Sequence, residues 1–278
     1  MSFVRIAGGA GVGFGGVPHH VEVTGSGPVC VLSAGLGLAW FDWDPVVELL
    51  APWRTVVRFD RPGAGLSGHA RVAPTLAGEA GRIARVLDAV GLSGPATVVG
   101  HSLAGFHCEA FARLFPARTA GLVLADSSVE ERPGVRVPRR VRVGAARMCG
   151  AVLGGAGLPR AAGPVLRRAA VRGDSAPGDA VRRVYGASRV LQGALLEYAT
   201  YGDLATELDA LRREFPLRGR LPVTVLAAYS HGPTTWLTRQ RGLAATLDAA
   251  FHVARPSGHL LIRDAPLAVA EAVLTTPR

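Results

Sequence analysis

Residues 96–105 read Ala-Thr-Val-Val-Gly-His-Ser-Leu-Ala-Gly and contain the pattern that decides the fold. The β-branched run Thr97–Val99 favours a buried strand, and apolar residues after Ser102 recur at helical spacing until Pro116. A strand that turns sharply into a helix at Gly-x-Ser lifts the serine hydroxyl out of the sheet. It also places the next backbone N–H, that of Leu103, at a helix start, where it can bind an oxyanion. The stretch therefore predicts Ser102 as a nucleophile.

Length and composition indicate an ordinary globular α/β protein. The chain has 278 residues, enough for one large domain or a core plus an insertion, and 49% of them are hydrophobic. It has no run of about 18 apolar residues, and Met1–Ile6 leads into Gly-rich sequence rather than a signal-peptide core. Cys30, Cys108 and Cys149 lack metal-ligand spacing and are typical of buried free thiols in a reducing compartment. We expect a cytoplasmic protein without metal or cofactor, and the pair His19–His20 in a loop.

Strand and helix patterns alternate along most of the chain. The expected strands, besides the one before Ser102, are Val21–Val23, Val29–Leu32, Thr55–Phe59, Gly121–Ala125, Val223–Ala227 and Phe251–Ala254, and clear helical patterns cover 41–50 and 75–90. Such alternation predicts a mostly parallel sheet with helices on both faces. Between Asp126 and Val223 the alternation stops. This segment is too long for a plain loop. We therefore predict a core of residues 1–128 and 219–278, with a helical cap, 129–218, inserted after the sixth strand.

Four motifs in this order resemble the α/β-hydrolase superfamily. Besides the Gly-x-Ser turn, Val31–Gly37 resembles the family's third strand and oxyanion loop. The segment Phe59–Ser67 is similar to the family's aromatic-Asp-Arg-x-Gly-x-Gly-x-Ser segment, and Ser257–His259 resembles its histidine loop. The resemblance implies an α/β-hydrolase fold with an eight-stranded type of sheet. One departure is Ala104, which stands where the family usually has glycine.

The resemblance also implies the order nucleophile, acid, histidine, which makes His259 the base. The acid usually follows the seventh strand, but the loop 229–234 contains no carboxylate. The chain resembles several haloalkane dehalogenases in having an acid, Asp126, at the end of the sixth strand. We predict Asp126 as the acid; Glu130 and Glu131 are the alternatives, and Asp126 would then only cap the following turn.

The other site residues follow from the same resemblance. The backbone N–H groups of Leu36 and Leu103 would bind the oxyanion. Gly35, Trp40 and His101 are expected to line the substrate pocket, although Trp40 could instead anchor the first helix in the core.

Together these residues predict a serine hydrolase that acts on a carboxylic ester, lactone or thioester through a Ser-His-Asp triad and an acyl-enzyme. Its partner would be a small-molecule acyl substrate. Two alternatives share the fold: an acyltransferase or cyclase that uses the same site, and a ligand-binding protein without turnover.

The predicted cap has an unusual charge. All 31 basic residues of the chain are arginine and the net charge is +10, but no aromatic–basic interleaving accompanies them, so we expect no nucleic-acid partner. From Arg132 through Arg172 there are ten arginines and no Asp or Glu, and Met148–Leu158 within this stretch is apolar. The combination suits docking at an anionic membrane surface, an acidic carrier protein or an anionic substrate. The stronger interpretation is that the apolar stretch closes the pocket and the arginines form a solvated outer face.

Overall fold

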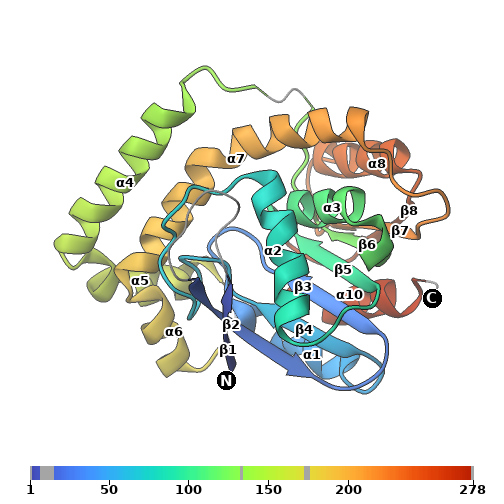
Figure 1. The fold of residues 1–278 in the computed structure, drawn as a ribbon, viewed down its shortest axis with the longest axis horizontal. Coiled ribbons are helices and arrows are strands. Elements are labelled where there is room, and N and C mark those ends of the chain that lie inside the picture. Colours follow the sequence, from blue (N-terminus) through green and yellow to red (C-terminus); the bar gives the residue numbers. More distant parts are fainter. Residues whose placement is uncertain (1, 7–15, 132–133, 172–175, 277–278) are drawn as a thin grey trace.

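One eight-stranded sheet organises the fold (Figure 1). The computed structural model describes residues 2–6, 16–131, 134–171 and 176–276. The strands lie in the order β1-β2-β4-β3-β5-β6-β7-β8, and β2 runs antiparallel to both of its neighbours while the remaining pairs are parallel. They are β1 (Ser2–Ile6), β2 (Val17–Thr24), β3 (Val29–Ser33), β4 (Thr55–Phe59), β5 (Ala96–His101), β6 (Thr119–Ala125), β7 (Val223–Ala228) and β8 (Ala250–Ala254). The mostly parallel sheet is thus confirmed.

Helices cover both faces of this sheet because its central strands carry apolar side chains on both sides. Val98 of β5 packs into the cluster with α2, α3 and α8, whereas its neighbour Val99 packs into the cluster with α1, α9 and α10. The bounds are α1 (Asp44–Leu50), α2 (Leu76–Ala89), α3 (Ala104–Leu114), α8 (Thr235–Leu247), α9 (Leu261–Asp264) and α10 (Pro266–Leu274), with 3₁₀ turns at Trp40–Trp43 and Pro116–Arg118. Thr75 caps α2, since its side chain accepts the Gly78 N–H at 3.1 Å.

Four helices lie between β6 and β7, where the cap is predicted. They are α4 (Arg139–Gly155), α5 (Leu158–Ala170), α6 (Gly178–Tyr185) and α7 (Ser188–Glu214). The 27-residue α7 runs back over the core, and Leu204 and Leu208 join the same apolar cluster as α2 and α3. Helix α4 packs mainly along α7 and forms the outer edge of the molecule on the left of Figure 1. No helix within the described residues is both long and apolar enough to cross a membrane.

Two local expectations are wrong. His19–His20 does not lie in a loop but in β2, where both side chains are buried. All three cysteines are free thiols, but only Cys30 and Cys108 are buried; Cys149 is exposed on α4. The reason is that the apolar stretch around Cys149 belongs to a helix with only one packed face.

Candidate functional site

The turn from β5 into α3 presents Ser102 in a strained conformation. Its φ of +54° lies in the left-handed region, which non-glycine residues rarely adopt. A Cβ on Gly100 would lie 2.5 Å from the Ala104 carbonyl oxygen, and one on Gly105 would lie 1.9 Å from Ser127 Oγ. The close approaches therefore occur at Gly100 and Gly105. The turn accommodates Ala104, the departure from the family pattern, because Ala104 needs no left-handed backbone.

The structure brings Ser102, His259 and Asp126 together. His259 lies in the loop between β8 and α9, with Nε2 2.9 Å from Ser102 Oγ and Nδ1 2.6 Å from Asp126 Oδ2. An ionised carboxylate only accepts hydrogen bonds, so Nδ1 carries the proton and Nε2 is left as an acceptor for the serine hydroxyl. Asp126, and neither Glu130 nor Glu131, takes the place beside the imidazole.

Two further donors fix the orientation of the Asp126 carboxylate. Its Oδ1 accepts the Ala228 backbone N–H at 2.9 Å and the Trp236 indole N–H at 2.7 Å. Asp126 itself is buried at the end of β6 and has a φ of +44°. The two carboxylate oxygens thus have separate partners: Oδ1 binds Ala228 and Trp236, and Oδ2 binds His259. Sequence reasoning missed Trp236, which comes from the loop and helix after β7.

The loop after β3 packs directly against the serine turn. A Cβ on Gly35 would lie 3.0 Å from Ser102 Cβ and 2.9 Å from His101 Nδ1, so only glycine allows this approach. Within the described part of the chain, neither the Leu36 nor the Leu103 backbone N–H donates to a protein acceptor. Leu103 also precedes α3, whose N-terminus favours negative charge. Two unused donors therefore come from the segments that flank Ser102.

Arg61 binds the backbone of the loop after β3 through two hydrogen bonds. Its Nη1 donates to the Ala34 carbonyl and its Nη2 to the Gly35 carbonyl at 3.1 Å. The same guanidinium forms a bidentate ion pair with Glu197 of α7, at 2.6 Å and 3.1 Å. Burial alone would lower the pKa of Arg61, but the Glu197 carboxylate outweighs it and raises that pKa. A buried cation thus connects a cap helix to the loop that carries Leu36.

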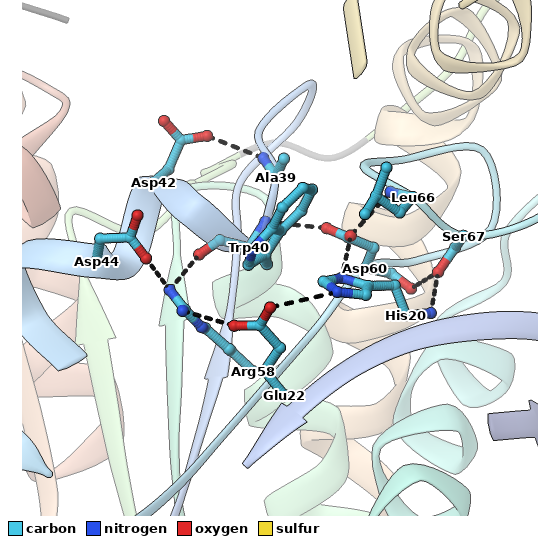
Figure 2. A network of polar contacts seen from close by, with 10 residues as sticks. All are labelled: His20, Glu22, Ala39, Trp40, Asp42, Asp44, Arg58, Asp60, Leu66 and Ser67. Atoms are coloured by element: carbon cyan, nitrogen blue, oxygen red, sulfur yellow. Dashed lines mark hydrogen bonds and ion pairs between the residues drawn. The ribbon is translucent and has the colours of Figure 1, made fainter. Parts of the chain in front are cut away.

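Asp60, the neighbour of Arg61, braces a separate network (Figure 2). Its Oδ1 accepts the Trp40 backbone N–H at 2.9 Å, and its Oδ2 accepts from His20 Nδ1 at 2.9 Å and from the Leu66 N–H at 3.0 Å. Burial would lower the pKa of His20, but its contacts with Asp60 and Glu22 raise it. These contacts tie the loop after β4 to β2 and to the start of the 3₁₀ turn.

Trp40 is almost completely buried at the joint between the core and the cap. Its ring packs edge-on against His20 and Phe41, and the same cluster contains Val181 and Val184 of α6. This placement agrees with the alternative in which Trp40 anchors the first helix in the core. A role of Trp40 in the substrate pocket stays a prediction.

His101 lies behind the histidine loop. Its Nε2 is 2.8 Å from the backbone carbonyl oxygen of His259, and the two rings are 5.0 Å apart. Burial lowers the pKa of His101 to about 4, so the ring is neutral near pH 7 and donates through Nε2. Its contacts support the His259 backbone, and the expected role in the substrate pocket is not tested by them.

A model of the alpha/beta hydrolase family matches residues 30–272. The chain belongs to this family. The match includes most of β3, the serine turn, helices α4 to α7 and the histidine loop. The chain therefore has the α/β-hydrolase fold, as the sequence motifs predict.

Curated relatives of this α/β-hydrolase are similar over part of their length. A protein named as the carbamate hydrolase RutD, from Azorhizobium caulinodans, is 35% identical over 108 residues, which are 38% of this chain and 40% of the relative. An AB hydrolase superfamily protein of Gibberella zeae is 30% identical over 37% of this chain and 34% of its own length. The matches thus span two fifths or less of these relatives.

Solved structures of other proteins share the whole fold. Cfl2 from Burkholderia cenocepacia has a TM-score of 0.74 at 21% identity, covering 95% of this chain and 93% of that one. A thermophilic esterase from Thermogutta terrifontis has a TM-score of 0.72 at 23% identity, covering 99% and 97%. The enol-lactonase from Burkholderia xenovorans has a TM-score of 0.65 at 21% identity, covering 93% and 95%. At these identities the likeness shows the α/β-hydrolase fold alone.

Proposed function

We propose that this α/β-hydrolase cleaves a carboxylic ester, lactone or thioester through an acyl-enzyme on Ser102. The observation that carries the proposal is the unbroken chain of hydrogen bonds from Ser102 Oγ through His259 to Asp126 Oδ2. A serine hydroxyl is a weak nucleophile at neutral pH and needs such a base to remove its proton. The exposed edge of His259, whose side chain is 53% accessible, leaves room for the proton transfers that the reaction needs.

In the first half of the proposed reaction, His259 Nε2 takes the Ser102 proton while Oγ bonds to the substrate carbonyl carbon. The carbonyl oxygen becomes an oxyanion, and the N–H groups of Leu36 and Leu103 stabilise it by about 3–4 kcal/mol per donor. His259 then gives its proton to the leaving alcohol or thiol, and the acyl-enzyme remains. Asp126 keeps Nδ1 protonated and stabilises the imidazolium that forms in each step.

In the second half, a water molecule attacks the acyl-enzyme and His259 accepts its proton. Collapse of the new tetrahedral intermediate returns the proton to Ser102 Oγ and releases the carboxylic acid. If an alcohol or amine replaced the water, the same residues would perform acyl transfer or cyclisation. A carbamate is a second candidate substrate, favoured by the 35% identity with a protein named as a carbamate hydrolase, and it would pass through the same kind of intermediate.

The test combines covalent labelling with product analysis. The wild type should react with a fluorophosphonate at Ser102, and Ser102→Ala should neither react nor turn over while its melting temperature stays near that of the wild type. A panel of p-nitrophenyl esters of increasing acyl length, with lactones, thioesters and carbamates, then defines the substrate class against Ser102→Ala as the blank. Full labelling of Ser102→Ala, or no labelling of the wild type, would contradict the proposal.

A further inference from the structure

The outer face of α4 carries an apolar stripe that is more than half exposed. Ala146 and Gly150 are buried toward α7. On the opposite side, Val141, Met148 and Val152 are 53%, 65% and 64% exposed. Their spacing of seven and four residues places them on one line along the helix. We call these three residues the outer stripe of α4.

The next helix also carries exposed apolar residues. Leu158, Val165 and Leu166 of α5 are 42%, 66% and 63% exposed, and α5 follows α4 after a turn and packs against it. Isolated exposed apolar residues need no explanation, but large ones repeated along two consecutive helices mark an interaction surface.

Only some of the arginines in residues 134–171 are neutralised within the protein. Arg139 and Arg142 pair with Asp203 of α7, and Arg167 is buried against Asp42. Five others are exposed and have no carboxylate partner among the described residues; they are Arg136, Arg140, Arg147, Arg160 and Arg168. Residues 134–171 contain no Asp or Glu at all. Arg132 and Arg172, which complete the ten arginines of the sequence prediction, lie outside the described residues.

The unneutralised arginines border the apolar stripe. At 100° per residue, Arg140 and Arg147 lie together on one shoulder of α4, between the buried side and the outer stripe. A helix with an apolar outer line and a basic shoulder has the pattern of a segment that lies in the plane of a membrane interface. Its flexible arginine side chains can reach the phosphate level while the apolar side chains enter the acyl boundary.

We propose that the outer stripe of α4, with its flanking arginines, docks this hydrolase on a membrane surface that contains anionic lipid. Each arginine near such a surface adds to the attraction. Charge complementarity carries the choice of an anionic surface, because the segment has no carboxylate that would oppose it. Figure 1 shows α4 at an outer edge of the molecule. Because the stripe lies opposite the buried Ala146 and Gly150, it faces away from α7.

The test is flotation of the purified full chain with two kinds of vesicle at low salt. We expect binding to vesicles of phosphatidylglycerol and phosphatidylcholine, weak binding to phosphatidylcholine alone, and release as salt rises. Met148→Gln/Val152→Gln should weaken binding about tenfold or more, because two apolar side chains no longer enter the interface. Its matched control is Trp53→Gln/Leu267→Gln. These two apolar residues lie on the surface outside residues 129–218 and are equally exposed, at 65% and 63%.

A second pair of variants tests the charge. Arg140→Gln/Arg147→Gln should weaken binding about tenfold or more, whereas Arg218→Gln/Arg220→Gln in the exposed loop before β7 should change it little. Melting temperature and fluorophosphonate labelling check that each variant is folded. Val141→Gln replaces Met148→Gln/Val152→Gln if that variant is not folded, and the single change Arg140→Gln likewise replaces the arginine double variant.

The proposal is overturned if the wild type does not float with anionic vesicles, or if the control variants lose as much binding as the test variants. Unchanged binding of Met148→Gln/Val152→Gln would also overturn it, since nonspecific attraction of a +10 protein would then suffice. Retention on polyglutamate without vesicle binding would instead identify an acidic protein as the occupant.

Discussion

Replacing Asp126 by Asn should invert the direction of the hydrogen bond to His259. The Ala228 N–H and the Trp236 indole N–H both point at Oδ1, so the asparagine oxygen must occupy that position. Its NH₂ group is then forced to face His259 Nδ1, where it can only donate. The imidazole must place its proton on Nε2, and Nε2 can no longer accept the proton of Ser102.

The size of the effect follows from the same geometry. With Oδ2 and Nδ1 2.6 Å apart, the charges of carboxylate and imidazolium are centred about 4 Å from each other, which corresponds to about 4 kcal/mol at an effective dielectric constant of about 20. That energy equals about a thousandfold in rate. The wrong tautomer adds to this loss, so we expect kcat to fall by roughly 10³–10⁴ in total.

The assay is kcat for an activated ester together with the rate of fluorophosphonate labelling, measured on the wild type and on Asp126→Asn. Both rates should fall, while the melting temperature changes little because asparagine has the shape of aspartate. Asp126→Ala is the comparison, since it leaves His259 free to choose its tautomer and should lose less activity than Asp126→Asn if the forced donor is the cause. An Asp126→Asn variant that keeps a tenth or more of the wild-type kcat would refute the reasoning.

Three further perturbations test other parts of the structure. Arg61→Lys keeps a charge beside Glu197 but cannot also donate to the carbonyls of Ala34 and Gly35; we expect about 1–3 kcal/mol less stability in urea and a lower kcat, and an unchanged kcat would contradict the positioning role. Gly100→Ala should lose about 1–3 kcal/mol and most activity because its Cβ meets the Ala104 carbonyl, whereas Gly94→Ala, in open space, should behave as the wild type. Burial lowers the pKa of His101 to about 4 and that of His107 to about 3, from 6.5, so the unfolded chain binds more protons and the free energy of unfolding should fall as the pH drops from 6.5 toward 4. His107→Leu should make this fall shallower in urea titrations at pH 7 and pH 5, and an equal slope in both proteins would show that His107 does not contribute.

The residues that sequence reasoning placed best are those whose role depends on local backbone chemistry. The stretch around Ser102 combines a β-branched run, two glycines at close approaches and a regular helical pattern, and each feature acts over only a few residues. The prediction of Asp126 rests on its place at the end of the sixth strand, where the chain resembles several haloalkane dehalogenases, and on the lack of a carboxylate in the loop 229–234. In the structure Asp126 lies beside His259. The division into a core and a helical cap stays a prediction.

Contacts between distant segments were not predictable in the same way. Glu197 lies 136 residues from Arg61 in the sequence. It belongs to a long helix without a simple apolar stripe, so the sequence does not show which of its residues face inward. Trp236 of α8 donates its indole N–H to Asp126 at the end of β6. No local sequence pattern indicates that an indole N–H would bind this carboxylate. Strand β1 was missed because it is a short edge strand followed by Gly-rich sequence, so its residues show little of the two-residue period.

The ion pair between Arg61 and Glu197 limits how freely this protein can be redesigned. Exchanging the predicted cap for that of another α/β-hydrolase is an obvious route to new substrates, since residues 129–218 form one contiguous segment. Such a graft would leave Arg61 as a buried cation without its carboxylate, which costs several kcal/mol and loosens the backbone next to Leu36. A chimera that keeps an acid at the position of Glu197 should therefore retain turnover where an otherwise identical graft does not.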